Sequence, residues 1–163
     1  MRILALIPVF ALAACENMMQ PVNATAPAPG TVVTPAVAGA PAPTLDPTPP
    51  PPPPAAARTV DQFDTTTDED KAEALAVDTA APSKDLGTTL ATLGPPAEPG
   101  IWLKTPLVTS LGMGVVSYKG KDANVELRPS GGAAGSGSQI SLAAMQTLGI
   151  PLTEIAEVSV AMK

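Results

Sequence analysis

Few side chains in this 163-residue chain could carry out covalent, acid–base or metal chemistry. The chain has one cysteine, Cys15, and no histidine, so counting alone excludes structural zinc sites, haem ligation, Cys-His nucleophiles and internal disulfides. Carboxylates are the groups left for catalysis or metal binding. We predict no catalytic residue, no metal site and no cofactor.

Aromatic and basic residues of the C-terminal half are the candidate ligand-binding groups. Trp102 and Tyr118 could stack on sugar rings, and Lys119 and Lys121 could approach the carboxylates of a ligand. In the simpler interpretation, Trp102 fills a small core and both lysines are solvated turn residues.

The net charge of −6 is unevenly distributed along the chain. Residues 61–85 contain eight acidic residues against Lys71 and Lys84, whereas the part from Ile101 onward is close to neutral. The chain therefore lacks the basic face that nucleic-acid binding requires. Its 21 prolines and four aromatic residues predict a small, modestly stable fold.

The first fourteen residues have the pattern of a signal peptide. Met1-Arg2 is followed by an apolar stretch, residues 3–14, that is shorter than the roughly 20 residues of a membrane-spanning helix. Leu12-Ala13-Ala14-Cys15 resembles the lipobox of bacterial lipoproteins, which implies cleavage before Cys15 and attachment of fatty acids such as palmitate to it. The alternative is a cysteine that ends an ordinary secretory leader. Because Glu16 is not the aspartate of the inner-membrane retention rule, the resemblance implies an anchor in the outer membrane of a Gram-negative bacterium, facing the periplasm.

Residues 15–60 form the lipidated N-terminus and a linker rich in proline and alanine. Proline fixes φ and lacks an amide donor, so the segment predicts a disordered stalk that samples extended polyproline II. It ends in six consecutive prolines, residues 49–54, which we interpret as a spacer. In the alternative interpretation this run binds the aromatic groove of a partner.

An acidic helical segment is expected over residues 61–85. Thr66 with Glu69 three residues later indicates a capping box, and the acidic first turn suits a helix N-terminus. The helix should run to Val77, with an apolar stripe of Ala72, Leu75 and Ala76.

The C-terminal residues 86–163 predict a small β-rich module. Alternating apolar residues indicate strands over residues 101–105, 114–118, 123–127 and 157–161, with Val125 and Leu127 facing the core. A short helix over residues 141–148 should end at Gly149, before Pro151. This mainly β pattern with one or two short helices favours a small β-barrel.

The same region resembles the rare lipoprotein A family, whose fold is a double-psi β-barrel. Gln139-Ile140-Ser141-Leu142-Ala143-Ala144-Met145-Gln146-Thr147-Leu148-Gly149 is similar to its Asp-Leu-Ser-x-Ala-Ala-x-x-x-Leu-Gly motif. The likeness covers about half of a family domain and implies a partial double-psi-like barrel. The acidic positions of the family's peptidoglycan-cleaving members fall on Pro129 and Gln139, so surviving catalysis would need Glu126 or Asp122, each more simply a solvent-facing strand or turn residue.

A second resemblance leads to the alternatives for function. Residues 63–67 and 100–108 look like alphaproteobacterial envelope lipoproteins that are labelled galactarate dehydratase, yet the chain offers no convincing metal or base for that reaction. We favour a non-enzymatic, membrane-anchored envelope lipoprotein that contacts peptidoglycan or a cell-wall protein. The alternatives are a remnant lytic transglycosylase of the rare lipoprotein A type, a purely structural subunit of an envelope complex and, disfavoured, the dehydratase.

Overall fold

A computed structural model describes residues 45–46, 48–80 and 83–163, all of which belong to a compact unit that spans Ala40–Lys163. The predicted signal peptide, the lipidation site at Cys15 and the linker before Leu45 lie outside the described residues. Within the described part of the chain, no helix is both long and apolar enough to cross a membrane.

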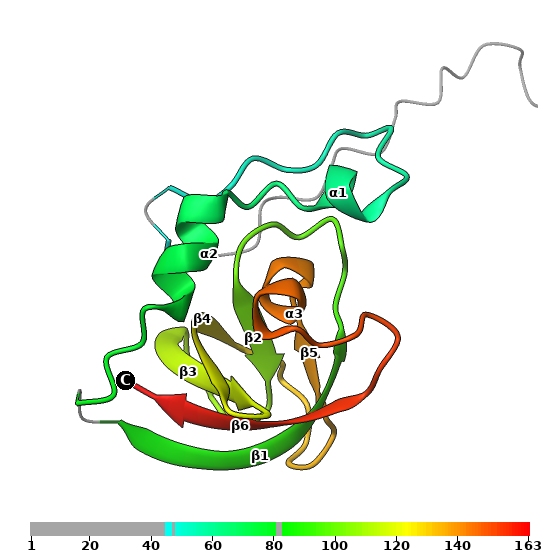
Figure 1. The fold of residues 1–163 in the computed structure, drawn as a ribbon. Helices are drawn as coiled ribbons and strands as arrows, with labels where there is room; N and C mark the ends of the chain where they lie inside the picture. The colour runs from blue at the N-terminus through cyan, green and yellow to red at the C-terminus, as the bar shows by residue number, and fades with distance from the viewer. Residues whose placement is uncertain (1–44, 47, 81–82) are drawn as a thin grey trace, which may run out of the picture. The chain divides into compact units, whose positions relative to one another are not determined.

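The unit is built on a closed, mixed barrel of six strands (Figure 1). The strands are β1 (Lys84–Leu93), β2 (Trp102–Thr105), β3 (Gly112–Tyr118), β4 (Lys121–Pro129), β5 (Ser138–Ile140) and β6 (Ala156–Met162). They follow one another around the barrel in the order β1, β5, β2, β4, β3, β6. The pairs β1/β5 and β2/β4 are parallel, and the other neighbouring pairs are antiparallel. The predicted mainly β fold is confirmed, and the structure adds two strands, β1 and β5, to the four expected.

Alternation along β4 separates an inner from an outer face. Ala123, Val125 and Leu127 are almost completely buried and belong to the hydrophobic core, as predicted for the last two. Since successive side chains of a strand point to opposite faces, Glu126 and Arg128 point away from that core.

The short helix expected over residues 141–148 is present as α3 (Leu142–Leu148), and it packs on the core. The Ser141 hydroxyl caps its start by accepting from the amide of Ala144 at 3.2 Å. Gly149 ends it in the left-handed region with φ 72°, where glycine has no Cβ penalty. Met145 and Leu148 are buried in the core.

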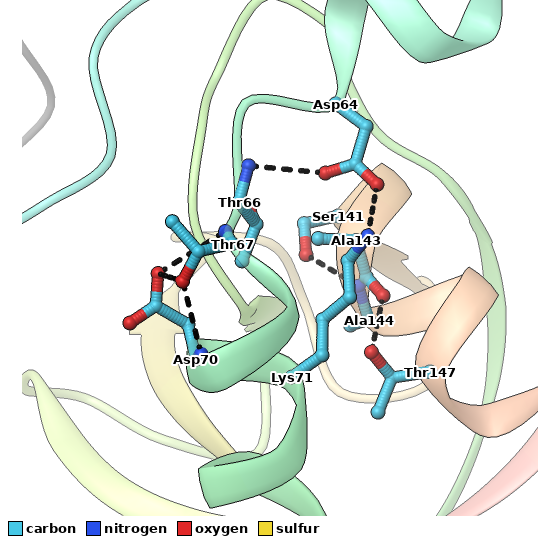
Figure 2. A network of polar contacts seen from close by, with 9 residues as sticks. All are labelled: Asp64, Thr66, Thr67, Asp70, Lys71, Ser141, Ala143, Ala144 and Thr147. Atoms are coloured by element: carbon cyan, nitrogen blue, oxygen red, sulfur yellow. Dashed lines mark hydrogen bonds and ion pairs between the residues drawn. The ribbon is translucent and has the colours of Figure 1, made fainter.

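The acidic segment forms two helices, α1 (Val60–Phe63) and α2 (Asp68–Leu75). The capping box of α2 is one residue later than predicted, because Thr67 and Asp70 exchange the hydrogen bonds that were expected of Thr66 and Glu69 (Figure 2). Its apolar stripe was also predicted wrongly. Leu75 is 48% exposed, and the residue buried on α2 is Ala74.

An ion pair holds the start of this segment next to α3. Asp64 accepts from the amide of Thr66 at 3.2 Å and from Lys71 Nζ at 2.6 Å, and its side chain is only 7% exposed. Figure 2 shows this pair beside the first turns of α3, and α2 contacts both α3 and β4. The acidic segment is therefore part of the folded unit.

Gly114 on β3 provides a test of the barrel's close packing. A Cβ at this position would overlap Leu127 and would lie 2.5 Å from the carbonyl oxygen of Ala161 on the neighbouring β6. We expect Gly114→Ala to lower the free energy of unfolding by about 3 kcal/mol, because backbone in a closed barrel has little room to move. Urea denaturation followed by circular dichroism measures it.

Gly112→Ala, on the same strand, is the matched control. Its Cβ would meet nothing closer than 3.7 Å, the Cε of Met162. We expect the free energy of unfolding to change by no more than about 1 kcal/mol. The added methyl group has room in the folded state, and alanine reduces the conformational entropy of the unfolded chain relative to glycine. Equal effects of the two substitutions would contradict the packing argument.

Candidate functional site

An open groove of about 560 Å³ lies between β1, the turn after β2, the Gly/Ser-rich loop and the start of β6. Four hydroxyl side chains line it: Thr88, Thr89, Thr92 and Ser136. Glu157 is the charged residue among the residues that line it. The groove therefore offers several hydroxyl groups and a single carboxylate for hydrogen bonding.

Two of the groove's hydroxyls, those of Thr89 and Thr92, are oriented by hydrogen bonds to Ser138. The Ser138 hydroxyl, 5% exposed, donates to Thr105 Oγ1 at 2.9 Å and lies 2.9 Å from Thr89 Oγ1. Because the Ser138 proton is used toward Thr105, Thr89 is the donor in the second contact. The oxygen of Thr89 can then accept a hydrogen bond from a ligand. Thr92 is oriented as well, since its hydroxyl donates to the Ser138 carbonyl at 3.4 Å.

Apolar side chains form the rest of the groove. Leu90 and Ile155 are 55% and 63% exposed, and Leu107 is partly buried beside them. The groove thus combines exposed aliphatic side chains with a few oriented hydroxyl groups, as small-molecule sites commonly do.

The structure does not bring the four predicted ligand-binding residues together. Trp102 on β2 pairs with Glu126, whereas Tyr118 at the end of β3 pairs with Lys121, five positions earlier on β4. At about 3.4 Å per residue, the two places are about 17 Å apart along the strand. Trp102 is fully buried, and its indole N–H donates to the carbonyl oxygen of Glu98 at 3.3 Å. Stacking of a sugar on this ring would require the covering loop to move away.

The remaining three residues form the tip of the β3–β4 hairpin. Lys119 and Gly120 both have positive φ, 47° and 81°, as a two-residue turn of the primed type requires. Tyr118 is 6% exposed and donates its hydroxyl to Glu154 at 3.3 Å. The ammonium group of Lys119 lies 4.7 Å from the centre of the Tyr118 ring, and the neighbouring Tyr118 hydroxyl raises the pKa of Lys119. Lys119 thus stays charged at neutral pH, and Lys121 is exposed beside it.

A buried charge cluster lies on the outer face of β4. Arg128 is 8% exposed, and its Nε–H donates to Glu126 Oε1 at 2.6 Å. The guanidinium carbon of Arg128 lies 5.1 Å from the centre of the Trp102 ring, and Lys104 Nζ lies 5.5 Å from the same ring centre. Glu98 contacts both cations, at 3.6 Å from Arg128 and 3.5 Å from Lys104. The arginine therefore contacts two carboxylates while it stacks on the indole, and Arg128 and Lys104 together balance the charges of Glu98 and Glu126.

Glu126 is 5% exposed, which corrects the expectation that it faces solvent. The backbone N–H of Leu45 donates to its second carboxylate oxygen, Oε2. Nearby, the Asn124 amide donates to the carbonyl oxygen of Ala76 at 3.1 Å, just after α2. The outer face of β4 is covered because these segments pack on it, a tertiary contact that β4's own alternation cannot reveal.

A second hollow, of about 610 Å³, lies between the Leu45 segment, α2 and β4. Its wall is acidic, but two of the carboxylates already have structural roles. Asp70 caps α2, and Glu126 binds Arg128. The first groove, which has a single carboxylate and several hydroxyl groups, is therefore the better candidate for a ligand.

The chain matches no protein-family model, and no curated protein or solved structure matches it significantly.

The groove was missed by sequence reasoning. Its residues come from four separate segments, and only the barrel brings Thr88–Thr92 next to residues 135–137 and 155–157. The sequence contained one indication of the groove, the pair Thr88-Thr89 beside an otherwise apolar stretch. Such threonine pairs are also common in loops, so the pair did not identify a site. Among the described residues, no three side chains of the metal-binding types gather closely enough to hold an ion.

Proposed function

We propose that this protein is a non-enzymatic envelope lipoprotein, anchored in the outer membrane by fatty acids on Cys15, whose barrel contacts peptidoglycan. The observation that carries the proposed contact is the groove of oriented threonine hydroxyls beside the exposed Leu90 and Ile155. Such a surface fits the glycan strand, whose sugar rings are uncharged and carry both hydroxyl groups and apolar faces. The anchor rests on the lipobox-like residues 12–15 and the stalk that follows.

The charge cluster supports a non-enzymatic role. Glycan cleavage needs a carboxyl group that can give a proton to the leaving oxygen. Both oxygens of Glu126 accept hydrogen bonds, from Arg128 and from the Leu45 amide, so neither oxygen is directed at a ligand in the groove. The stacked, ion-paired arrangement is that of a structural group.

The likeness to rare lipoprotein A proteins is part of this proposal. A closed barrel with two parallel strand pairs is compatible with a double-psi arrangement. Pro129 at the end of β4 and Gln139 on β5 stand where that family has acidic residues, which supports descent without the cleavage activity.

Pelleting with purified sacculi tests the proposal. The full chain, in detergent, should sediment with sacculi, and Leu90→Ala should weaken this binding about fivefold because a half-exposed leucine loses its contact with the sugar. Leu75→Ala is the matched control, since Leu75 is similarly exposed at 48% but lies on α2, away from the groove. It should bind like the unchanged chain.

Measuring muropeptide release in the same sacculus assay distinguishes the alternative functions. Release of soluble muropeptides that stops on Glu126→Gln would replace the proposal with a transglycosylase. Failure to sediment with sacculi would point instead to a purely protein-binding subunit of the envelope.

A further inference from the structure

The proline run of residues 49–54 does not project from the folded unit as a free spacer. Each proline holds φ near −65°, each residue before a proline is restricted to extended ψ, and the described residues contain no cis peptide bond. The run is therefore a left-handed polyproline II helix with three residues per turn.

Burial along the run follows this period of three. Pro50 is buried and Pro53 is partly buried, whereas Pro49, Pro51, Pro52 and Pro54 are exposed. Residues three apart share one side of such a helix, so the Pro50/Pro53 side packs on the domain. The Cδ of Pro50 lies 3.9 Å from where a Cβ of Gly100 would stand. The other two sides, Pro49/Pro52 and Pro51/Pro54, face solvent.

Hydrogen bonds hold the run in place at its middle and at its end. The Thr65 hydroxyl, just after α1, donates to the carbonyl oxygen of Pro51 at 2.6 Å. The Ala57 amide donates to the carbonyl oxygen of Pro54 at 2.9 Å, which forms the turn that ends the helix. The docked side and these two bonds fix both position and rotation of the proline helix.

We propose that the two outward sides of residues 49–54 are a recognition surface for a partner protein with a groove lined by aromatic side chains. Such grooves bind polyproline II helices, whose proline rings pack between the aromatic side chains. Prolines three positions apart lie on the same side of the helix and can enter the same groove. Arg58 is exposed shortly after the run and is the basic residue between Leu45 and Asp70. An acidic side chain at one end of the partner's groove would complement it. Because docking has already ordered the helix, the partner does not bear that entropy cost.

The test compares the full chain with a synthetic peptide of residues 48–58. The probe is an isolated WW or SH3 domain, chosen beforehand because it binds this peptide measurably. If the outward sides are presented, the chain in detergent binds the probe as tightly as the peptide or up to about threefold more tightly, as measured by titration calorimetry. Weaker binding by the chain than by the peptide would show that docking hides the run and would overturn the proposal.

Two double variants that remove the same number of prolines test the sides separately. Pro51→Ala with Pro54→Ala changes an outward side and should weaken probe binding at least tenfold. Pro50→Ala with Pro53→Ala changes the docked side and should weaken it by no more than about threefold, toward the value of the free peptide. Thermal unfolding verifies that both variants fold. Equal losses from the two variants would refute the assignment of an outward recognition side.

Discussion

Replacing Trp102 with alanine is expected to lower the free energy of unfolding by about 3–5 kcal/mol, the range for a large aromatic side chain removed from a packed interior. The indole is fully buried, and the loop at Gly94 packs so closely on it that a Cβ there would lie 2.5 Å from the ring. The substitution leaves a cavity and removes the surface on which Arg128 stacks. Urea denaturation of the full chain measures the effect.

Trp102→Phe is the control for this prediction. It keeps an aromatic ring in the cavity but loses the hydrogen bond to the Glu98 carbonyl, so the expected loss is smaller, about 1–2 kcal/mol. Both variants should retain sacculus binding in conditions where they are folded, because Trp102 does not line the groove. A stable Trp102→Ala variant that fails to bind sacculi would instead make Trp102 a ligand-binding residue.

Replacing Arg128 with methionine is the second substitution with a large expected effect. It leaves Glu126, 5% exposed, without the guanidinium group at 2.6 Å that balances its charge. Loss of one partner of a buried ion pair costs about 3–5 kcal/mol, because the remaining charge stays desolvated. The chain should therefore unfold at a markedly lower urea concentration at neutral pH.

The double variant Glu126→Gln with Arg128→Met separates charge from shape. With the carboxylate made neutral, most of the lost stability should return, because the double variant no longer buries a carboxylate charge that has lost its guanidinium group. A double variant as unstable as Arg128→Met alone would mean that the arginine stabilises the domain by its packing on Trp102 and not by its charge.

Sequence reasoning succeeded where the physical cause is local. The start of α3 depends on the Ser141 hydroxyl and its end on Gly149, both readable within one turn of helix. The inner face of β4 follows from alternation at Val125 and Leu127. By contrast, β5 has only three residues, and β1 carries threonines and exposed positions that hide its alternation. These two strands exist because they complete the barrel, a reason that no short window of sequence contains.

The candidate site could not be predicted for the same reason. Aromatic and basic residue types drew attention to Trp102, Tyr118, Lys119 and Lys121. Residue type does not indicate that Trp102 and Tyr118 are buried while both lysines are exposed. Glu126 was expected to face solvent, yet its ion pair with Arg128 allows both side chains to be buried under neighbouring segments.

By itself, the sequence determined that the chain carries one thiol, no histidine, a run of six prolines and a capped helix within a β-rich C-terminal half. These features depend on composition or on neighbours a few residues away. Only the tertiary structure decided which side of the proline helix is docked, which carboxylate is balanced by Arg128, and which threonines share a groove. The docked proline side and the groove depend on tertiary contacts between segments that are distant in the chain. Glu126 and Arg128 are only two residues apart on β4, but other segments must cover that face before the pair is buried.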